Sequence, residues 1–290
     1  MDRHWAADPI LTVALANFDL GGEPRSEPLP QGRARGSVVV TTNAGRYVAR
    51  ALGPRLAAPA AVQLRHAFVA HLAAQGLCVP RFVPTRAGEC VARVPGGVIE
   101  VQESVEGRPL SAAVSGDTAL AGEAVAALHR AGEGFDPPTR PSFSVEPELA
   151  QLGRMERQMQ TYLPAPEVLE QMFHVKHCLS EGARALGNAA LPAGMLHGDL
   201  RPAHLLLDAE GRVWVTSYDA CQWGALLLDV ADLAHHFGED AVAAYAQRRL
   251  LTEAERRLGA AAEQVMLIRR GLAEGSGVSA LAGRLKGETG

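Results

Sequence analysis

Asp199 lies in a stretch of sequence that suits a carboxylate for accepting a proton. The stretch runs from His197 to His204 and reads HGDLRPAH, with Pro202 opposing a helix directly after the acid. A short apolar run at 205–207 and a second at 213–216 predict two buried strands that form a hairpin. A carboxylate in a loop held by rigid strands can act as a general base toward a hydroxyl. The alternative is that Asp199 only caps nearby backbone groups, the commoner fate of a loop aspartate.

The first hundred residues of the chain predict a small lobe of antiparallel strands with one longer helix. The first 20 residues predict a short helix, and residues 23–36 predict a loop because they are rich in Pro, Gly and Arg. One helix is expected from Ala60 to Gln75, where apolar residues recur at helical spacing and Gly76 closes the helix. The strands expected here are 37–42 and 46–52 as a hairpin, a short one near 81–83, and the pair 89–94 and 98–104.

The remainder of the chain predicts mostly helix. Leu120 to Arg130 is amphipathic, residues 149–188 predict two helices broken at Pro164 and Pro166, and residues 224–272 are again mostly helical. The Gly-rich end at 274–290 is expected to fray. The pattern therefore predicts an α+β protein with a small antiparallel lobe followed by a larger helical lobe.

Composition restricts the function further. A chain of 290 residues predicts two domains, or one domain in two lobes. A net charge of −4 gives no general attraction to nucleic acid or to acidic lipid, and no apolar run approaches the roughly 20 residues of a membrane helix. The four cysteines are widely spaced, which favours reduced thiols in a cytoplasmic protein over disulfides or zinc.

The order of these elements, together with several short motifs, resembles the aminoglycoside phosphotransferase family, whose relatives include choline, homoserine and fructosamine kinases. The matching motifs are the segment from His197 to His204, Tyr47-Val-Ala-Arg50, Gly76-Leu-Cys-Val-Pro80, Glu106-Gly-Arg-Pro-Leu110, Leu128-His129 and Gly224 with Asp229-Val-Ala231. The resemblance spans roughly residues 20–240. It implies a two-lobed protein-kinase-like fold, with a nucleotide-binding lobe at 1–105 and a mainly helical lobe at 106–290. The second lobe would carry the catalytic loop 195–208 and the acceptor site.

The resemblance assigns Asp199 as the catalytic base, with His197 as part of its motif. It implies ATP or GTP with Mg²⁺ or Mn²⁺, and a small acceptor with a hydroxyl group. The family's metal-binding Asn is replaced here by His204, and Ser217 stands where a second metal-binding Asp is expected. Asp219 lies two residues on, so in an extended strand it would point to the same side as Ser217 and could replace it as a ligand.

The nucleotide side also departs from the family pattern. The family's phosphate-binding Lys is absent, because the first lysine of the chain is Lys176, and Arg50 occupies the corresponding strand position. The helix acid expected to pair with it is replaced by Arg65 or His66, so Arg50 is expected to lack an ion-pair partner. The segment Val101-Gln-Glu-Ser104 is the expected hinge, whose backbone groups, with Gln102 and Ser104 among them, would contact the purine of either ATP or GTP.

Two functions therefore remain open. One is a small-molecule kinase; the other is an inactive pseudokinase that binds a ligand or a protein partner in the old cleft. Acidic residues of the helical lobe would attract an amine-bearing acceptor, although each is expected to be a solvated surface acid. These acids are Glu146, Glu148, Glu156, Asp229 and Asp232.

Overall fold

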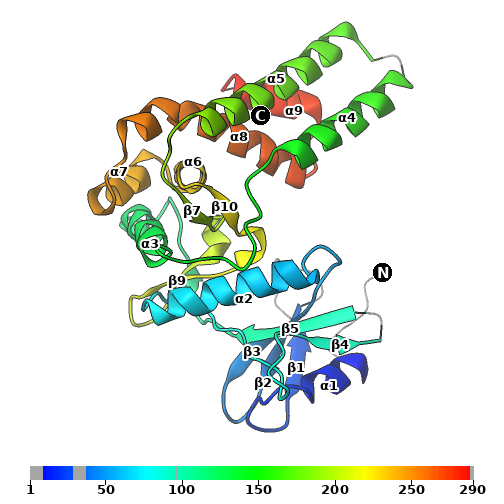
Figure 1. The fold of residues 1–290 in the computed structure, drawn as a ribbon, viewed down its shortest axis with the longest axis vertical. Helices are drawn as coiled ribbons and strands as arrows, with labels where there is room; N and C mark the ends of the chain where they lie inside the picture. The colour runs from blue at the N-terminus through cyan, green and yellow to red at the C-terminus, as the bar shows by residue number, and fades with distance from the viewer. Residues whose placement is uncertain (1–8, 29–36, 96, 163, 288–290) are drawn as a thin grey trace. The chain divides into compact units, whose positions relative to one another are not determined.

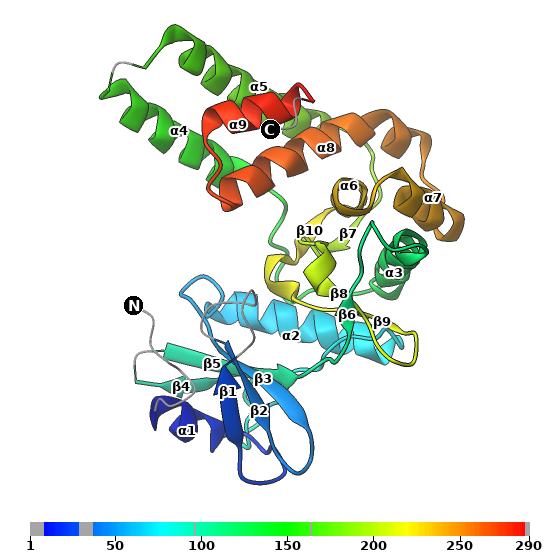
Figure 2. The ribbon, with the colours of Figure 1, turned by 180° about the vertical axis from the view of Figure 1, so that it is seen from behind.

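A computed structural model describes residues 9–28, 37–95, 97–162 and 164–287 of the chain (Figures 1 and 2). The chain divides into two compact units, each built from three separate segments. Unit 1 comprises residues 1–109, 130–140 and 203–219, and unit 2 comprises residues 110–129, 141–202 and 220–290. No helix among the described residues is both long and apolar enough to cross a membrane.

Unit 1 is built on an antiparallel sheet of five strands in the order β1-β2-β3-β5-β4. The predicted hairpin is confirmed, and so is the pairing of β4 with β5. The prediction of a loop over 23–36 was wrong at its start, because residues 25–28 pair with β2 and extend the sheet. The strands are β1 (Arg25–Pro28), β2 (Ser37–Thr41), β3 (Arg46–Ala51), β4 (Ala92–Val94) and β5 (Gly97–Glu103).

The two faces of this sheet carry different side chains, because successive residues of a strand point to opposite sides. Helix α1 (Pro9–Leu15) contributes to a buried apolar cluster with one face, where Ile99 and Val101 of β5 are almost fully buried. Helix α2 (Pro59–Ala74) runs across the other face (Figure 1). Glu100 lies between Ile99 and Val101 in sequence and therefore points toward α2.

A strand near 81–83 is not formed; that expectation was wrong. Pro80 lacks an amide hydrogen, and this segment makes only an isolated bridge between Phe82 and Gln102. The hairpin expected directly after the Asp199 loop is present as β8 (Leu205–Leu207) and β9 (Val213–Val215). It is joined by the short strand β6 (Arg108–Pro109) in a three-stranded sheet.

Unit 2 is mainly helical, with a two-stranded sheet of β7 (Ala193–Leu196) and β10 (Gln222–Ala225). Helix α8 packs against α5 and α6. It begins with a capping box in which the Thr252 hydroxyl accepts from the Glu255 N–H and the Glu255 carboxylate accepts from the Thr252 N–H. The helices are α3 (Asp117–Ala131), α4 (Glu146–Gln160), α5 (Pro166–Asn188), α6 (Leu227–Phe237), α7 (Glu239–Arg248), α8 (Glu253–Ala273) and α9 (Val278–Leu285).

The break between α4 and α5 at the two prolines is confirmed. The prediction that residues after 274 fray was wrong for α9. This helix packs against α5 and α8, and its Leu281 and Ala282 are buried. Gly271 lies under Leu281, where a Cβ would come within 2.2 Å of the leucine Cδ2 atom, so α8 and α9 pack closely. Tertiary burial here outweighs the glycine-rich composition that indicated fraying.

Candidate active site

The loop that carries Asp199 is fixed through its backbone by two buried carboxylates of α6. Asp229 accepts hydrogen bonds from the N–H groups of His197 and Gly198 at 2.7 and 2.9 Å. Asp232, one helical turn on, accepts from the N–H of Leu200 at 2.5 Å. The residues on both sides of Asp199 are therefore held by the same helix, and the position of its carboxylate is restricted.

The side chain of Asp199 lies at the surface of unit 2, with about a quarter of its area exposed. The guanidinium of Arg201 donates to it through Nε at 2.7 Å. The Asp199 N–H donates to Nδ1 of His197, whose ring is fully buried. His197 thus supports the turn from inside, and the Asp199 carboxylate is partly exposed and paired with Arg201.

Gly198 enables this turn through its backbone conformation. Its φ of +78° lies in the left-handed region, which residues with a Cβ rarely adopt. A Cβ at this position would also come within 2.5 Å of the Ala220 carbonyl oxygen. Any other residue between His197 and Asp199 would therefore displace the loop.

Asp229 is the centre of a buried polar network in unit 2. His129 of α3 contacts the Asp229 carboxylate through Nε2 at 3.2 Å and the Tyr245 hydroxyl through Nδ1 at 2.8 Å. Burial by itself raises the pKa of Asp229, but hydrogen bonds from His129 and the Gly198 N–H, with the charges of His129 and His197, lower it below its ordinary value. Asp229 is therefore an ionised anchor.

The expectation that Asp229 and Asp232 are solvated surface acids was wrong, because both are fully buried. They face inward from α6 because they lie three residues apart on the same side of the helix as Leu228 and Leu233. Asp232 also pairs with Arg270 of α8, whose guanidinium contacts the ring of His236. Burial lowers the pKa of His236 to about 4, so this ring is neutral near pH 7.

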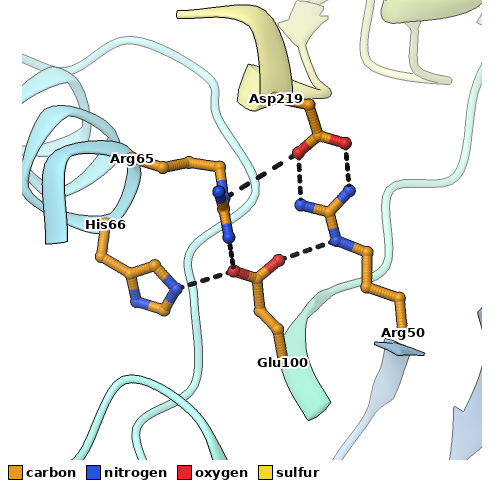
Figure 3. Close-up of polar contacts among 5 residues, drawn as sticks. All are labelled: Arg50, Arg65, His66, Glu100 and Asp219. Carbon is orange, nitrogen blue, oxygen red and sulfur yellow. Dashed lines mark hydrogen bonds and ion pairs between the residues drawn. The ribbon is translucent and has the colours of Figure 1, made fainter. Parts of the chain in front are cut away.

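The candidate nucleotide side lies in unit 1, around Arg50 of β3 (Figure 3). Arg50 stands directly opposite Glu100 in the β3–β5 ladder and donates to it through Nε at 2.7 Å. Its two terminal nitrogens donate to the two carboxylate oxygens of Asp219, at 2.6 and 2.5 Å. The expectation that Arg50 lacks an ion-pair partner was therefore wrong, since the acid comes from strand β5 and not from the helix.

Helix α2 contributes a second cation where an acid was expected. Arg65, with only 2% of its side chain exposed, donates through one terminal nitrogen to Glu100, and Nε2 of His66 lies 2.9 Å from the same oxygen. The His66 ring stacks on Phe82. Burial alone raises the pKa of Glu100, but these contacts and the charges of both arginines lower it to about 2. Glu100 is an anion shared between two arginines.

Ser217 and His204, the residues expected at the family's metal-ligand positions, both lie in unit 1. Ser217 has a φ of +68° and is the only non-glycine residue with a positive φ in the part of the chain that the structure describes. Asp and Asn tolerate this region better than most residues, so the backbone at 217 suits the aspartate that the resemblance expects. The His204 carbonyl accepts from the Thr216 N–H at 2.9 Å, which places His204 beside the β8–β9 hairpin.

The expected hinge belongs to the sheet of unit 1. Gln102 lies opposite Val48 of β3 and also forms the bridge to Phe82. The N–H of Ser104 donates to the Arg46 carbonyl at 3.0 Å. Contacts of Gln102 and Ser104 with a nucleotide stay predictions.

Comparisons with known proteins identify the family and the fold of the chain. The model of the phosphotransferase enzyme family matches residues 26–262, which is most of the chain. The chain belongs to the phosphotransferase enzyme family. A homoserine kinase of Methylobacillus flagellatus is 27% identical over 221 residues, covering 75% of this chain and 65% of that protein. One of Methylobacterium nodulans is 28% identical over 194 residues, covering 67% and 58%. The chain thus matches less than two thirds of the length of these relatives.

Solved structures confirm the protein-kinase-like fold. A microcompartment-associated aminopropanol kinase matches with a TM-score of 0.67 at 19% identity, covering 95% of this chain and 96% of that one. The amicoumacin kinase hAmiN in complex with AMP-PNP, Ca²⁺ and Ami matches with a TM-score of 0.63 at 16% identity, covering 94% and 89%. The predicted α+β, kinase-like fold class is therefore confirmed.

The phosphotransferase family implies a divalent cation, for which the described side chains form no complete ligand set. Within the described ranges there is no group of three or more His, Cys, Asp or Glu side chains placed to hold a metal ion. Both oxygens of Asp219 accept from Arg50, so neither is directed at a cation alone. The metal-ligand roles of His204 and Asp219 stay predictions.

Sequence reasoning missed Glu100 and its pairing with Arg65. A signal for Glu100 exists, because it interrupts the apolar run Val98-Ile-Glu-Val101 in a strand that is otherwise suited to burial. An ionisable residue in such a strand needs a charged partner on the same face. Arg50, directly opposite Glu100 in the neighbouring strand β3, supplies that partner.

Proposed function

We propose that this member of the phosphotransferase family transfers the terminal phosphoryl group of a nucleoside triphosphate to a hydroxyl of a small molecule. Asp199 acts as the base that orients the hydroxyl and takes its proton. Arg50 contacts the phosphates. Phosphoryl transfer needs little covalent assistance from a protein, because positioning and charge neutralisation supply most of the catalysis.

The support that carries this proposal is the way the Asp199 loop is held. Three N–H groups around Asp199, those of residues 197, 198 and 200, donate to carboxylates of α6. A loop acid that merely capped its own backbone would not require two buried carboxylates, each of which costs desolvation. Buried interactions that fix the position of one carboxylate are typical of a catalytic group.

The acceptor we propose is a small molecule that carries both a hydroxyl and an amine. The matched relatives are described as homoserine kinases, and one matched structure as an aminopropanol kinase. Homoserine and aminopropanol each carry a hydroxyl and an amine. This proposal agrees with the amine-bearing acceptor considered from the sequence, although Asp229 and Asp232 are engaged with the loop and are not the residues that would attract the amine.

A coupled phosphotransfer assay tests the proposal. The purified chain is supplied with ATP or GTP, with Mg²⁺ or Mn²⁺, and with homoserine, 1-amino-2-propanol, choline or kanamycin as acceptor. Product is expected with at least one amino alcohol, and Asp199→Asn is expected to lower kcat/KM by roughly 10²–10⁴-fold, the usual contribution of a general base. The control Glu210→Gln makes the same charge change at an exposed position and should have no effect. Equal activity of Asp199→Asn, or no product with any acceptor, would refute the proposal.

The second candidate is a nucleotide-binding or partner-binding pseudokinase. It is favoured by the pairing of Asp219 with Arg50 and by the presence of Ser217 and His204 at the expected metal-ligand positions. The double variant His204→Asn with Ser217→Asp restores the family's ligand types. Activity that appears only in this variant would establish the pseudokinase, whereas activity of the unmodified chain would exclude it.

A further inference from the structure

The charged cluster of unit 1 contains a cation that the resemblance does not account for. Arg65 is, with His66, one of the two helix residues where an acid was expected, and it is one of the largest fully buried side chains of the described residues. Burying a guanidinium is costly unless it is paired, and replacing it with an apolar residue is often neutral or stabilising. Its presence beside Arg50 therefore calls for a role.

The charges of the cluster balance only when Asp219 is included (Figure 3). The Glu100 carboxylate forms ion pairs with both arginines, with Nε of Arg50 and with a terminal nitrogen of Arg65. One acid thus faces two guanidinium groups, leaving one positive charge. Asp219 supplies the second negative charge, and a third of its side chain is exposed while Glu100 is fully buried. Asp219 is therefore the anion on the open side of the cluster.

The Asp219 carboxylate satisfies the hydrogen-bond donors of only one of the two arginines. Asp219 gives both of its oxygens to Arg50, and the Nε of Arg65 is buried with no hydrogen-bond partner. This Nε lies 3.9 Å from Asp219 Oδ1, which is an ion-pair distance but too long for a hydrogen bond. A tetrahedral anion has a third oxygen, which a planar carboxylate lacks, and so can satisfy both guanidinium groups together.

We propose that Arg50 and Arg65 form one site for the phosphates of a nucleotide, and that the Asp219 carboxylate occupies this site until phosphate displaces it. Arg65 is then a second phosphate-binding residue, and Glu100 is the positioning residue that holds both arginines. The inference rests on the proposed function and adds to it the competition between an internal carboxylate and the nucleotide.

The competition predicts how binding changes when the charge of Asp219 is removed. Tripolyphosphate and ATP are titrated calorimetrically in EDTA, so that no divalent cation contributes. Asp219→Asn keeps the size of the side chain, and metal-free binding of both probes is expected to tighten at least tenfold. Glu210→Gln, which makes the same change in net charge on the exposed β8–β9 turn, should leave binding unchanged. Unchanged affinity of Asp219→Asn would overturn the proposal, and so would binding of tripolyphosphate but not of ATP.

The role of Arg65 is tested separately, because a variant at a fully buried position can fail to fold. In the Asp219→Asn protein, the Arg65 Nε–Hε signal is assigned by NMR through its own side chain and followed during tripolyphosphate titration. A shift that saturates with the calorimetric affinity is expected. A stationary Arg65 signal during saturable binding would remove Arg65 from the site. Adding Arg65→Lys to the Asp219→Asn protein should weaken the binding of tripolyphosphate at least tenfold. An unchanged affinity of the folded double variant would overturn the assignment of Arg65.

These outcomes separate this inference from the proposed function. If the unmodified chain transfers phosphate to an acceptor while Asp219→Asn leaves metal-free binding unchanged, the competition is refuted and the kinase stands. If no form of the protein binds any nucleotide, with or without a divalent cation, both proposals are refuted.

Discussion

Replacing Glu100 with Gln should destabilise the protein at neutral pH, because it removes the buried anion shared by Arg50, Arg65 and His66. The pKa of Glu100 falls from its ordinary 4.5 to about 2 in the folded chain. At about 1.36 kcal/mol for each pKa unit, this difference corresponds to about 3 kcal/mol of unfolding free energy above pH 5. The value agrees with the roughly 3–5 kcal/mol lost when one partner of a buried ion pair is removed.

The sign of the pH dependence follows from the direction of the pKa change. A carboxyl group whose folded pKa is lowered stabilises the protein above its unfolded pKa, and this contribution disappears as the pH falls toward the folded pKa. The difference between the wild-type protein and Glu100→Gln should therefore be constant from pH 5 to 7. It should shrink as the pH falls from about 4.5 toward 2.

Urea unfolding followed by circular dichroism measures this difference at pH 7, 5, 4 and 3. The control is Glu106→Gln, which removes an acid paired with Arg46 at an exposed position, where an ion pair contributes about 0–1 kcal/mol. Its effect should stay within about 0.5 kcal/mol at every pH. Equal stability of Glu100→Gln and wild-type protein at pH 7, or a difference that does not shrink in acid, would refute the description of Glu100 as an anion held by two arginines.

Substitutions at three further positions test the backbone around the site. Gly198 and Gly211 both have a positive φ, but only a Cβ at Gly198 would meet a neighbour, at 2.5 Å from the Ala220 oxygen. Gly211→Ala should therefore lower the unfolding free energy by about 1–2 kcal/mol, and Gly198→Ala should lower it by more. Equal thermal-unfolding shifts would count against the close approach. Asp229→Asn should lower the unfolding free energy by about 3 kcal/mol. It should also reduce the rate of phosphotransfer more than the affinity for nucleotide, because it loosens the loop that carries Asp199. A normal rate with reduced stability would make Asp229 purely structural. Ser217→Gly should stabilise the chain by up to about 1 kcal/mol by relieving its positive φ, while Ser217→Val should destabilise it; the opposite order in urea unfolding would contradict strain at this residue.

The fold was predictable where local signals and tertiary packing agree. The β2–β3 hairpin follows from two β-branched and aromatic runs around Asn43-Ala-Gly45, and the break between α4 and α5 follows from two prolines. Helix α9 and strand β1 were not predictable in this way. Their sequences carry Gly or Pro, and they are ordered by contacts with α5, α8 and β2 that no local pattern reveals.

The candidate site was predictable in its residues but not in its connections. The HGDLRPAH segment points to Asp199 because its motif is local in sequence. The carboxylates that hold this loop come from about 30 residues further on, and their burial depends on the side of α6 that faces inward. Likewise, the pairing of Arg50 with Glu100 depends on strand register, which one strand's own sequence does not specify.

The segmented composition of unit 1 has a consequence for how the chain is made. Strand β6 at residues 108–109 pairs with residues 206–207, and Asp219 closes the segment of unit 1 that is last in the sequence. A ribosome therefore releases the five-stranded sheet roughly a hundred residues before it releases the hairpin and carboxylate that complete the unit. During that interval β6 has no pairing partner and Arg50 has only Glu100. An unpaired strand edge in a partly made chain favours association with other chains, so expression of residues 1–109 alone should give a fragment that aggregates more readily than the full chain.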